Sequence, residues 1–202
     1  MRYLFLLFLL LNIVVFASSQ EALDAYKNHE YKKAFTLYEQ AAKSGDTTAQ
    51  NALSYLYFKG IGVSQDKKEG LVWITKAAKS GNVRAAYDLG MMYLVGENVQ
   101  KDLKKAAKWF EIAADKGNTE AQFNLALMYF NGDGVKQDLN KAADLLEKAA
   151  KQGHIRAKQN VGRVYMQALN FKKAKYWLGE NIKDGDVQAA TLLKELEAAH
   201  KE

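Results

Sequence analysis

The sequence predicts an all-α protein, a solenoid in which antiparallel helix pairs stack one on the next. Three observations lead to this prediction. Four glycines, Gly45, Gly81, Gly117 and Gly153, recur at a fixed step of 36 residues. Proline is absent from all 202 residues, whereas an average usage of about 5% would give about ten, and a chain without proline suits tightly connected helices. Segments rich in Ala, Lys, Glu and Leu favour helix as well.

Many other positions keep the same 36-residue step, so the chain contains internal repeats. These positions are Ala49, Ala85, Ala121 and Ala157; Leu53, Leu89, Leu125 and Val161; Tyr57, Tyr93, Tyr129 and Tyr165; Gly60, Gly96 and Gly132; Val63, Val99 and Val135; Asp66, Asp102 and Asp138; and Trp73 and Trp109, with Leu145 in that place next. One such repeat cannot bury its apolar face alone, but three or more stacked repeats can.

Residues 1–19 have the layout of a secretory signal peptide. Arg2 supplies a positive start, residues 4–16 are almost wholly apolar, and small residues follow. The apolar run is too short to span a bilayer, which takes about 20 residues. We therefore expect cleavage after Ala17 or after Ser19 and no membrane span in the mature chain. A retained membrane anchor is the alternative.

Residues 20–45 are expected to form a short N-terminal helix pair. Tyr26 and Tyr31 flank the expected turn, and Ala34 follows on the second helix. Residues 46–153 then hold three full 36-residue repeats.

Residues 82–117 show how a full repeat becomes two helices. Asn82 is a candidate N-cap for the first helix, and Asp102 is one for the second, because such side chains accept hydrogen bonds from unpaired amides. Gly96 and Gly117 end the two helices, since glycine adopts a left-handed conformation at little cost. The inner faces are predicted from spacings of three and four residues. They comprise Ala85, Leu89, Met92 and Tyr93 on the first helix, and Ala106, Trp109, Phe110, Ala113 and Ala114 on the second.

The two last segments depart from this pattern. Residues 154–185 form a repeat that is four residues shorter and lacks the loop with two glycines. Residues 186–202 are expected to form a C-terminal capping helix. Glu197 stands there in the place of the repeated tyrosine, and a charge at that place suits a helix that faces water.

The repeated residues match a known family. Ala85, Leu89-Gly90 and Tyr93, then Gly132-Asp133-Gly134-Val135 and Asp138, then Lys105-Ala106, Trp109, Ala113-Ala114 and Gly117 follow the pattern of the Sel1-like repeat. The resemblance extends over roughly residues 21–195, and the short end pairs resemble tetratricopeptide (TPR) repeats. It implies a right-handed superhelical solenoid of antiparallel helix pairs.

In related solenoids the first helix of each pair lines a concave groove, and this gives a candidate protein-binding surface. The residues on it are Asn51 and Tyr55, Tyr87 and Met91, Phe123 and Leu127, and Gln159 and Arg163, from four successive repeats. An apolar and aromatic stripe that becomes polar at one end can hold an extended peptide or a partner helix. The same helical spacing is also typical of core positions, so packing is the open alternative for Tyr55, Met91 and Leu127.

The composition argues against several other functions. Basic residues number 29 and acidic residues 23, for a net charge of +6, and they are interspersed without a basic stripe, so we expect no nucleic-acid partner. The three histidines have no ligand-like spacing, which predicts no metal site and no cofactor. Cysteine is absent, which excludes thiol chemistry, disulfides and a lipid-anchored lipoprotein.

One set of short motifs points to an enzyme. Ser64-Gln-Asp-Lys67, Ser80-Gly-Asn82 and the two Lys-Ser-Gly segments at 43–45 and 79–81 match motifs of serine β-lactamases and penicillin-binding proteins. Some cysteine-rich relatives are named for such activities, but their cysteines are missing here. A weak β-lactam hydrolase is therefore the alternative function, with no catalytic residue assigned.

The resemblance and the leader segment together predict an exported protein, in the periplasm or outside the cell, that acts as an adaptor for a protein or peptide ligand. A third hypothesis is a spacer whose ends make the contacts. The sequence does not specify the oligomeric state.

Overall fold

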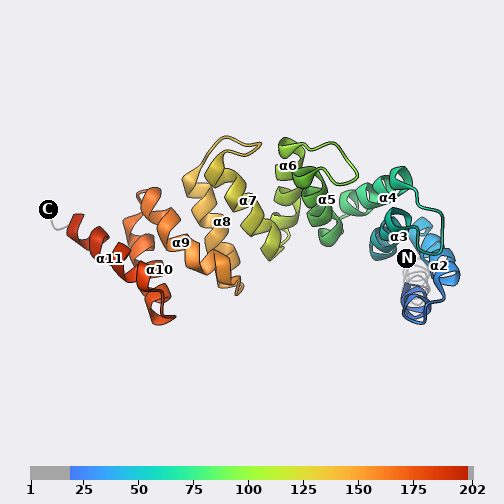
Figure 1. Cartoon of the computed structure of the whole chain (residues 1–202), viewed down its shortest axis with the longest axis horizontal. Coiled ribbons are helices and arrows are strands. Elements are labelled where there is room, and N and C mark those ends of the chain that lie inside the picture. The colour runs from blue at the N-terminus through green and yellow to red at the C-terminus, as the bar shows by residue number, and fades with distance from the viewer. Residues whose placement is uncertain (1–18, 200–202) are drawn as a thin grey trace, which may run out of the picture. The chain divides into compact units, whose positions relative to one another are not determined.

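The computed structural model describes residues 19–199, and all regular structure in that range is α-helical (Figure 1). Residues 19–27 are helical. The helices that follow are α2 (Tyr31–Lys43), α3 (Thr47–Lys59), α4 (Lys67–Lys79), α5 (Val83–Val95), α6 (Leu103–Asp115), α7 (Thr119–Asn131), α8 (Leu139–Lys151), α9 (Ile155–Gln167), α10 (Phe171–Lys183) and α11 (Val187–Ala199). The predicted all-α fold class is confirmed.

The chain divides into two compact bodies, one that ends at Leu89 and one that begins at Gly90. In the N-terminal body, α3 packs on both α2 and α4. In the C-terminal body, each helix from α6 to α11 packs on the next, and α9 also contacts α11. From α2 to α4 and from α6 to α11, helices that follow one another therefore pack together, as a series of helix pairs requires.

The helices begin where the sequence predicts. The Asn82 side chain accepts a hydrogen bond from the amide of Ala85 at 2.9 Å, and Asp102 accepts one from the amide of Lys105 at 3.0 Å. Both predicted N-caps are confirmed. Gly117 follows α6 with a φ of 85°, a left-handed conformation that costs glycine little.

The loop between the two helices of a repeat distinguishes the full repeats from the short one. In the third repeat the amide of Asp138 donates to the carbonyl of Tyr129 at 2.9 Å, whereas in the short repeat Asn170 donates to Tyr165 at the same distance. The equivalent hydrogen bond thus joins residues nine apart in the full repeat and five apart in the short one. The four residues that the short repeat lacks are therefore missing from this loop. Leu169 takes the left-handed conformation there, with a φ of 58°.

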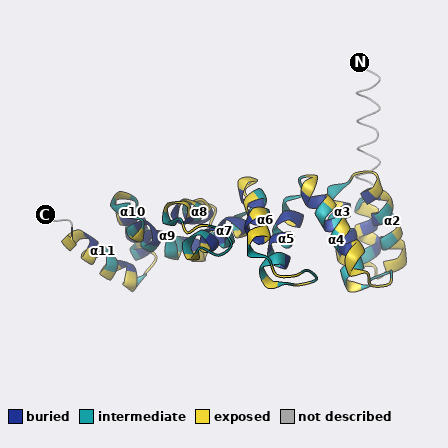
Figure 2. Cartoon of the chain, turned by 90° about the horizontal axis from the view of Figure 1, so that it is seen from above, coloured by how far each residue is buried: buried dark blue, intermediate teal, exposed yellow. Residues whose placement is uncertain are grey.

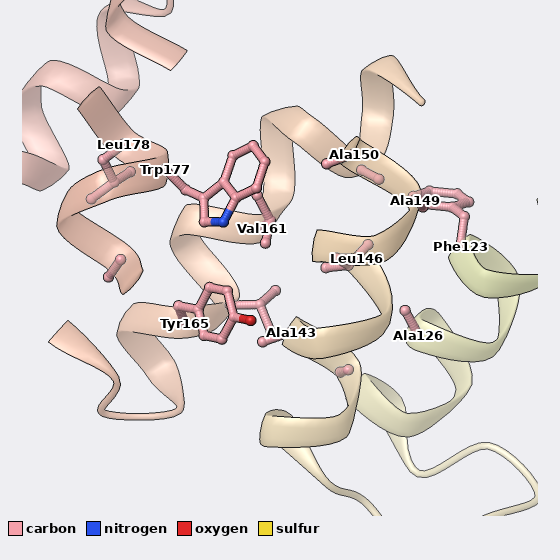
Figure 3. Close-up of a cluster of buried hydrophobic side chains, with 14 of the residues drawn as sticks. Phe123, Ala126, Ala143, Leu146, Ala149, Ala150, Val161, Tyr165, Trp177 and Leu178 are labelled. Carbon is pink, nitrogen blue, oxygen red and sulfur yellow. The ribbon is translucent and has the colours of Figure 1, made fainter. Parts of the chain in front are cut away.

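The buried residues lie where neighbouring helices meet (Figure 2). Alanines provide many of the buried contacts, and large side chains fill the remaining space. Figure 3 shows this core around α8, with Phe123 reaching it from α7 and Trp177 from α10. A second buried cluster in the N-terminal body is centred on Tyr38, Leu53 and Leu56.

The predicted inner face of α6 needs one correction. Phe110 is fully buried, but its neighbour Trp109 is only half-buried. Phe110 occupies the close contact with the preceding helix, because a Cβ atom added to Gly90 would lie 2.5 Å from the Phe110 ring. Glycine at position 90 thus makes room for Phe110, and Trp109 lies at the edge of the core.

The capping helix α11 has the polarity that the sequence predicts. Leu196 is buried, whereas Glu197 is exposed and forms an ion pair with Lys175 at 2.5 Å. The predicted signal peptide, residues 1–19, lies outside the described residues except for Ser19. Within residues 19–199, no helix combines the length and the apolar character that a membrane crossing requires.

Candidate protein-binding site

The N-terminal body carries three of the predicted groove residues. Tyr55 on α3 is 47% exposed, and Asn51, one turn earlier, is half-buried. Burial raises the pKa of the Tyr26 hydroxyl, and the adjacent Tyr55 raises it further, so these two tyrosines lie side by side. Tyr87 on α5 is half-buried, with the Arg84 guanidinium 5.9 Å from its ring centroid.

The next three predicted residues, in the C-terminal body, differ from one another. Leu127 on α7 is 38% exposed, and the Met91 sulfur on α5 is 3.9 Å from the Asn124 amide nitrogen. Phe123 is only 5% exposed. The prediction that Phe123 contacts a partner is therefore wrong, because its ring is part of the core.

His154 and Arg156 account for the burial of Phe123. The His154 ring stacks on the Phe123 ring with centroids 4.4 Å apart and planes 24° apart, and the Arg156 guanidinium lies 5.1 Å from the same centroid. His154 is also the N-cap of α9, because its Nδ1 accepts a hydrogen bond from the amide of Ala157 at 3.0 Å. The space between α7 and α9 is thus filled by a ring from each side.

The last two predicted groove residues, Gln159 and Arg163, lie together in an open cleft of about 780 Å³. The cleft is bounded by α9, the end of α10 and the start of α11. Its lining residues are Gly153, Ile155, Lys158, Gln159, Asn160, Arg163, Asn181, Asp184, Gly185, Asp186 and Gln188. This volume falls within the range of about 300–1,000 Å³ that is typical of ligand sites.

The charges in the cleft are paired. Lys158 forms an ion pair with Asp184 at 2.5 Å, and Arg163 forms one with Asp186 at 3.6 Å. Arg163 also donates a hydrogen bond to the Gln188 carboxamide at 2.7 Å. The cleft therefore has little net charge with which to select an ionic ligand.

Carboxamides supply the remaining polarity. Asn181 lies at the bottom of the cleft, almost fully buried, and its amide donates to the main-chain oxygen of Gln159 at 3.3 Å. Asn160 donates to the main chain of Arg156 at 2.7 Å. A carboxamide both donates and accepts hydrogen bonds, as does each peptide unit of an extended chain.

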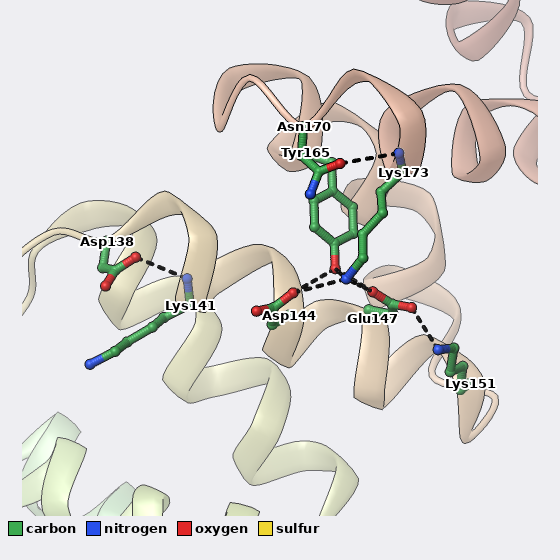
Figure 4. Close-up of polar contacts among 8 residues, drawn as sticks. All are labelled: Asp138, Lys141, Asp144, Glu147, Lys151, Tyr165, Asn170 and Lys173. Atoms are coloured by element: carbon green, nitrogen blue, oxygen red, sulfur yellow. Dashed lines mark hydrogen bonds and ion pairs between the residues drawn. The ribbon is translucent and has the colours of Figure 1, made fainter.

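A polar cluster on the neighbouring helices joins the third repeat to the short one (Figure 4). The buried Tyr165 hydroxyl on α9 shares its one proton between two carboxylates on α8, Asp144 at 2.8 Å and Glu147. Lys173 on α10 donates to Glu147 at 2.8 Å and to the Tyr165 oxygen at 2.8 Å. Lys151 donates to the other oxygen of Glu147 at 2.6 Å.

The cluster changes the ionisation of its members. Burial disfavours the charged form of Glu147, but hydrogen bonds from Lys151, Lys173 and Tyr165 outweigh it and lower the pKa to about 2. Burial, followed by the hydrogen bonds to Glu147 and Asp144, raises the pKa of Tyr165 well above its ordinary value. At neutral pH these shifts keep Glu147 ionised and the Tyr165 hydroxyl protonated, so the hydroxyl remains a donor to the carboxylates on α8.

Sequence reasoning missed the α10 and α11 side of the cleft and the polar cluster. The sequence does contain a pattern that indicates the polar cluster. Tyr93 is followed by Lys105 and Tyr129 by Lys141, each pair at a twelve-residue step, and the lysine nitrogens lie 5.2 and 5.1 Å from the ring centroids. In the short repeat, four fewer residues bring Lys173 to the same place beside Tyr165, at 4.7 Å.

The β-lactamase-like motifs lie in turns. Ser64 is an exposed loop residue, and the segments at 43–45 and 79–81 end α2 and α4. No strand accompanies them within residues 19–199, so the structural context of that chemistry is absent from the described chain. In the same range no three His, Cys, Asp or Glu residues are grouped as metal ligands would be.

Comparisons with known proteins agree on the fold. One solved structure, a protective antigen of uropathogenic Escherichia coli with an SLR fold, is 33% identical with a TM-score of 0.63. The match covers 79% of this chain and 35% of that protein, so the chain spans about a third of its length. A Sel1 repeat protein from Oxalobacter formigenes is 40% identical over 61% of this chain and 93% of its own, with a TM-score of 0.59.

A more distant structure, the MamA protein, shares 17% identity over 93% of this chain and 96% of its own, with a TM-score of 0.50, and supports the fold alone. A comparison with curated proteins finds no match. The Sel1 repeat family model matches residues 25–46, 47–82, 83–118 and 119–154. Since these matches cover well over half of the sequence, the chain belongs to the Sel1 repeat family.

Proposed function

We propose that this Sel1 repeat protein is an exported scaffold that binds a partner protein through the first helices of its repeats. The observation that supports this most is the cleft beside α9, where two residues predicted from the sequence, Gln159 and Arg163, line one open cleft of about 780 Å³. Tyr55, 47% exposed on α3, offers a second contact surface on the N-terminal body. Tyrosine is common among residues that dominate protein interfaces.

The polarity of the cleft favours a peptide over an ionic small molecule. Its lysine and arginine are paired with aspartates at 2.5 and 3.6 Å, and carboxamides surround them. Such groups suit a main chain, which offers donors and acceptors in alternation.

Export is part of the proposal. The layout of residues 1–19 supports it, and so does the description of the Escherichia coli relative as a protective antigen. Mass spectrometry of the protein purified from fractionated cells tests it. We expect a mature chain that begins after Ala17 or Ser19 in the periplasmic or secreted fraction. Full-length protein in the cytoplasm would contradict export.

The binding surface is tested with three variants of the mature chain. Cross-linking in envelope extract identifies candidate partners, and the strongest is purified for measurement of its dissociation constant. We expect Tyr55→Ala or Gln159→Ala to weaken that complex, because both residues lie on first helices. Tyr176→Ala is the matched control, since Tyr176 is 60% exposed but lies on α10, a second helix. Weakening by the control alone would contradict the proposal.

The same complex also tests the alternative that the protein is a spacer whose ends make the contacts. A protein that contacts its partner only through its ends should lose binding when residues 186–202 are deleted and keep it in both first-helix variants. That outcome would replace the groove with the end of the chain as the binding surface.

A further inference from the structure

The structure itself shows what fits between two successive first helices. Gln159 stands 36 residues after Phe123, at the same place on the next first helix. Asp186 stands 32 residues after His154, the step of the short repeat, and both residues precede their helices. The cleft between α9 and α11 is therefore the same space that two rings fill between α7 and α9.

The change of these two residues explains why the second space is open. Phe123 and His154 stack at 4.4 Å and close the first space. A carboxamide and a carboxylate replace them at Gln159 and Asp186, and both side chains line the open cleft. Arg156, which covers the Phe123 ring, is replaced by Gln188.

We propose that the cleft between α9 and α11 takes an aromatic side chain carried on an extended peptide segment of a partner protein. This inference deepens the proposed function and rests on it, since it states which chemistry the scaffold recognises. The ring of the partner would take the place that Phe123 takes one repeat earlier.

The walls of the cleft offer contacts to such a ring. Arg163 is two-thirds buried and supplies a guanidinium, a group that lies favourably over aromatic faces, as Arg156 does over Phe123. Ile155 lines the cleft with its side chain 72% exposed, so a partner can cover this apolar group. Gln159 and Gln188 also line the cleft, and their carboxamides can donate hydrogen bonds to the carbonyls of a peptide main chain.

Three short peptides test the chemistry. They are acetyl-Gly-Ser-Phe-Ser-Gly-amide and the two peptides with Leu or Ser in place of Phe. Each is titrated into the isotope-labelled mature chain at neutral pH while the side-chain carboxamide signals of Gln159, Asn160 and Asn181 are followed by NMR. We expect saturable shifts with the Phe peptide and roughly two- to ten-fold weaker binding of the Leu peptide, as the contribution of aromatic contacts implies. The Ser peptide should produce no saturable shift.

Two variants supply the controls. Gln159→Phe combined with Asp186→His rebuilds the ring pair of the preceding space, and should abolish binding of the Phe peptide while the helical circular dichroism stays unchanged. Asp186→His can keep the cap, because His154 makes the equivalent cap on α9. Tyr176→Ala, on an exposed face of α10, should bind the Phe peptide like the unmodified chain.

Several results would overturn the inference. The first is equal affinity for the Leu and Phe peptides, and the second is no saturable shift up to the solubility limit. The third is a carboxamide shift on simple dilution of the protein, which would assign the cleft to a second copy of the chain. If binding of a purified partner still depends on Tyr55, failure of the cleft inference leaves the proposed scaffold function standing.

Discussion

Two neighbouring spaces in the C-terminal body have the same backbone pattern and opposite contents. Between α7 and α9, the stacked rings of Phe123 and His154 leave Phe123 only 5% exposed. Between α9 and α11, Gln159 and Asp186 occupy the matching positions and line an open cleft. The side chains at these positions thus decide whether a space between first helices is filled or open, while the helix pairs around it keep their form.

The largest expected difference between the two spaces is in how much stability the chain loses when a residue in each space is truncated. Phe123→Ala should lower the free energy of unfolding by about 3–5 kcal/mol, as truncation of a buried aromatic residue does. Gln159→Ala should change it by less than about 0.5 kcal/mol, because the side chain lies on the surface. Urea unfolding followed by circular dichroism measures both values, and a similar cost for the two variants would show that the spaces do not differ as described.

The polar cluster beside the open space should make stability depend on pH. The pKa of Glu147 is lowered to about 2 in the folded chain, so its contribution is complete above the ordinary pKa of a glutamate. It is lost as the pH falls from about 4.3 towards 2. Glu147→Gln should cost about 1–3 kcal/mol at pH 7 through lost charged hydrogen bonds and should flatten the decline between pH 4.3 and 2, a range taken from these two pKa values. Thermal melts across that range give both quantities, and an unchanged acid profile would contradict this assignment.

A comparison between the first and third repeats predicts a stabilising substitution. Within residues 19–199 the buried Gln50 Oε1 has no hydrogen-bond partner. The equivalent atom of Gln122, its Oε1, accepts a hydrogen bond from the Gln152 side-chain amide at 2.7 Å. Ser80 occupies the position of Gln152, with a similar backbone (φ −82°, ψ 6° against φ −90°, ψ 7°).

Ser80→Gln should therefore raise the free energy of unfolding by about 0.5–1.5 kcal/mol, the value of one buried hydrogen bond. Chemical denaturation measures the gain, and Ser80→Ala is the control that should show none. Equal stability of the glutamine and alanine variants would show that the added side chain does not reach Gln50.

The smallest expected effect comes from filling the open space. Gln159→Phe with Asp186→His should stabilise the chain by about 0.5–1 kcal/mol, at the lower end of what an aromatic pair contributes. A change in melting temperature reports it. A clear loss of stability would mean that the α9–α11 space cannot hold the ring pair.

The sequence predicted most of the fold because its signals are local and repeated. Asn82 and Asp102 cap helices, and Gly117 ends one, through contacts a few residues away. The relative burial of Trp109 and Phe110 was less predictable, because both lie within the apolar stripe. Which of the two is buried depends on the space that Gly90 leaves on another helix.

The exposure of the predicted groove residues was foreseen only in part, for the same reason. Periodicity placed Phe123 and Gln159 on one stripe, but exposure depends on what the following repeat supplies. His154 covers Phe123, and Asp186 leaves Gln159 uncovered. The cleft residues on α10 and α11 have no periodic signature of their own, so their convergence emerges only from the packing of three helices.

The most direct test of the central contrast is a pair of double-mutant cycles on the free energy of unfolding. One cycle combines Phe123→Ala with His154→Ala, and the other combines Gln159→Ala with Asp186→Ala. We predict a coupling energy of about 0.5–1.5 kcal/mol for the ring pair and one within about 0.3–0.5 kcal/mol of zero for the residues of the cleft. Equal coupling in the two cycles would contradict the conclusion that one space is filled and the other open.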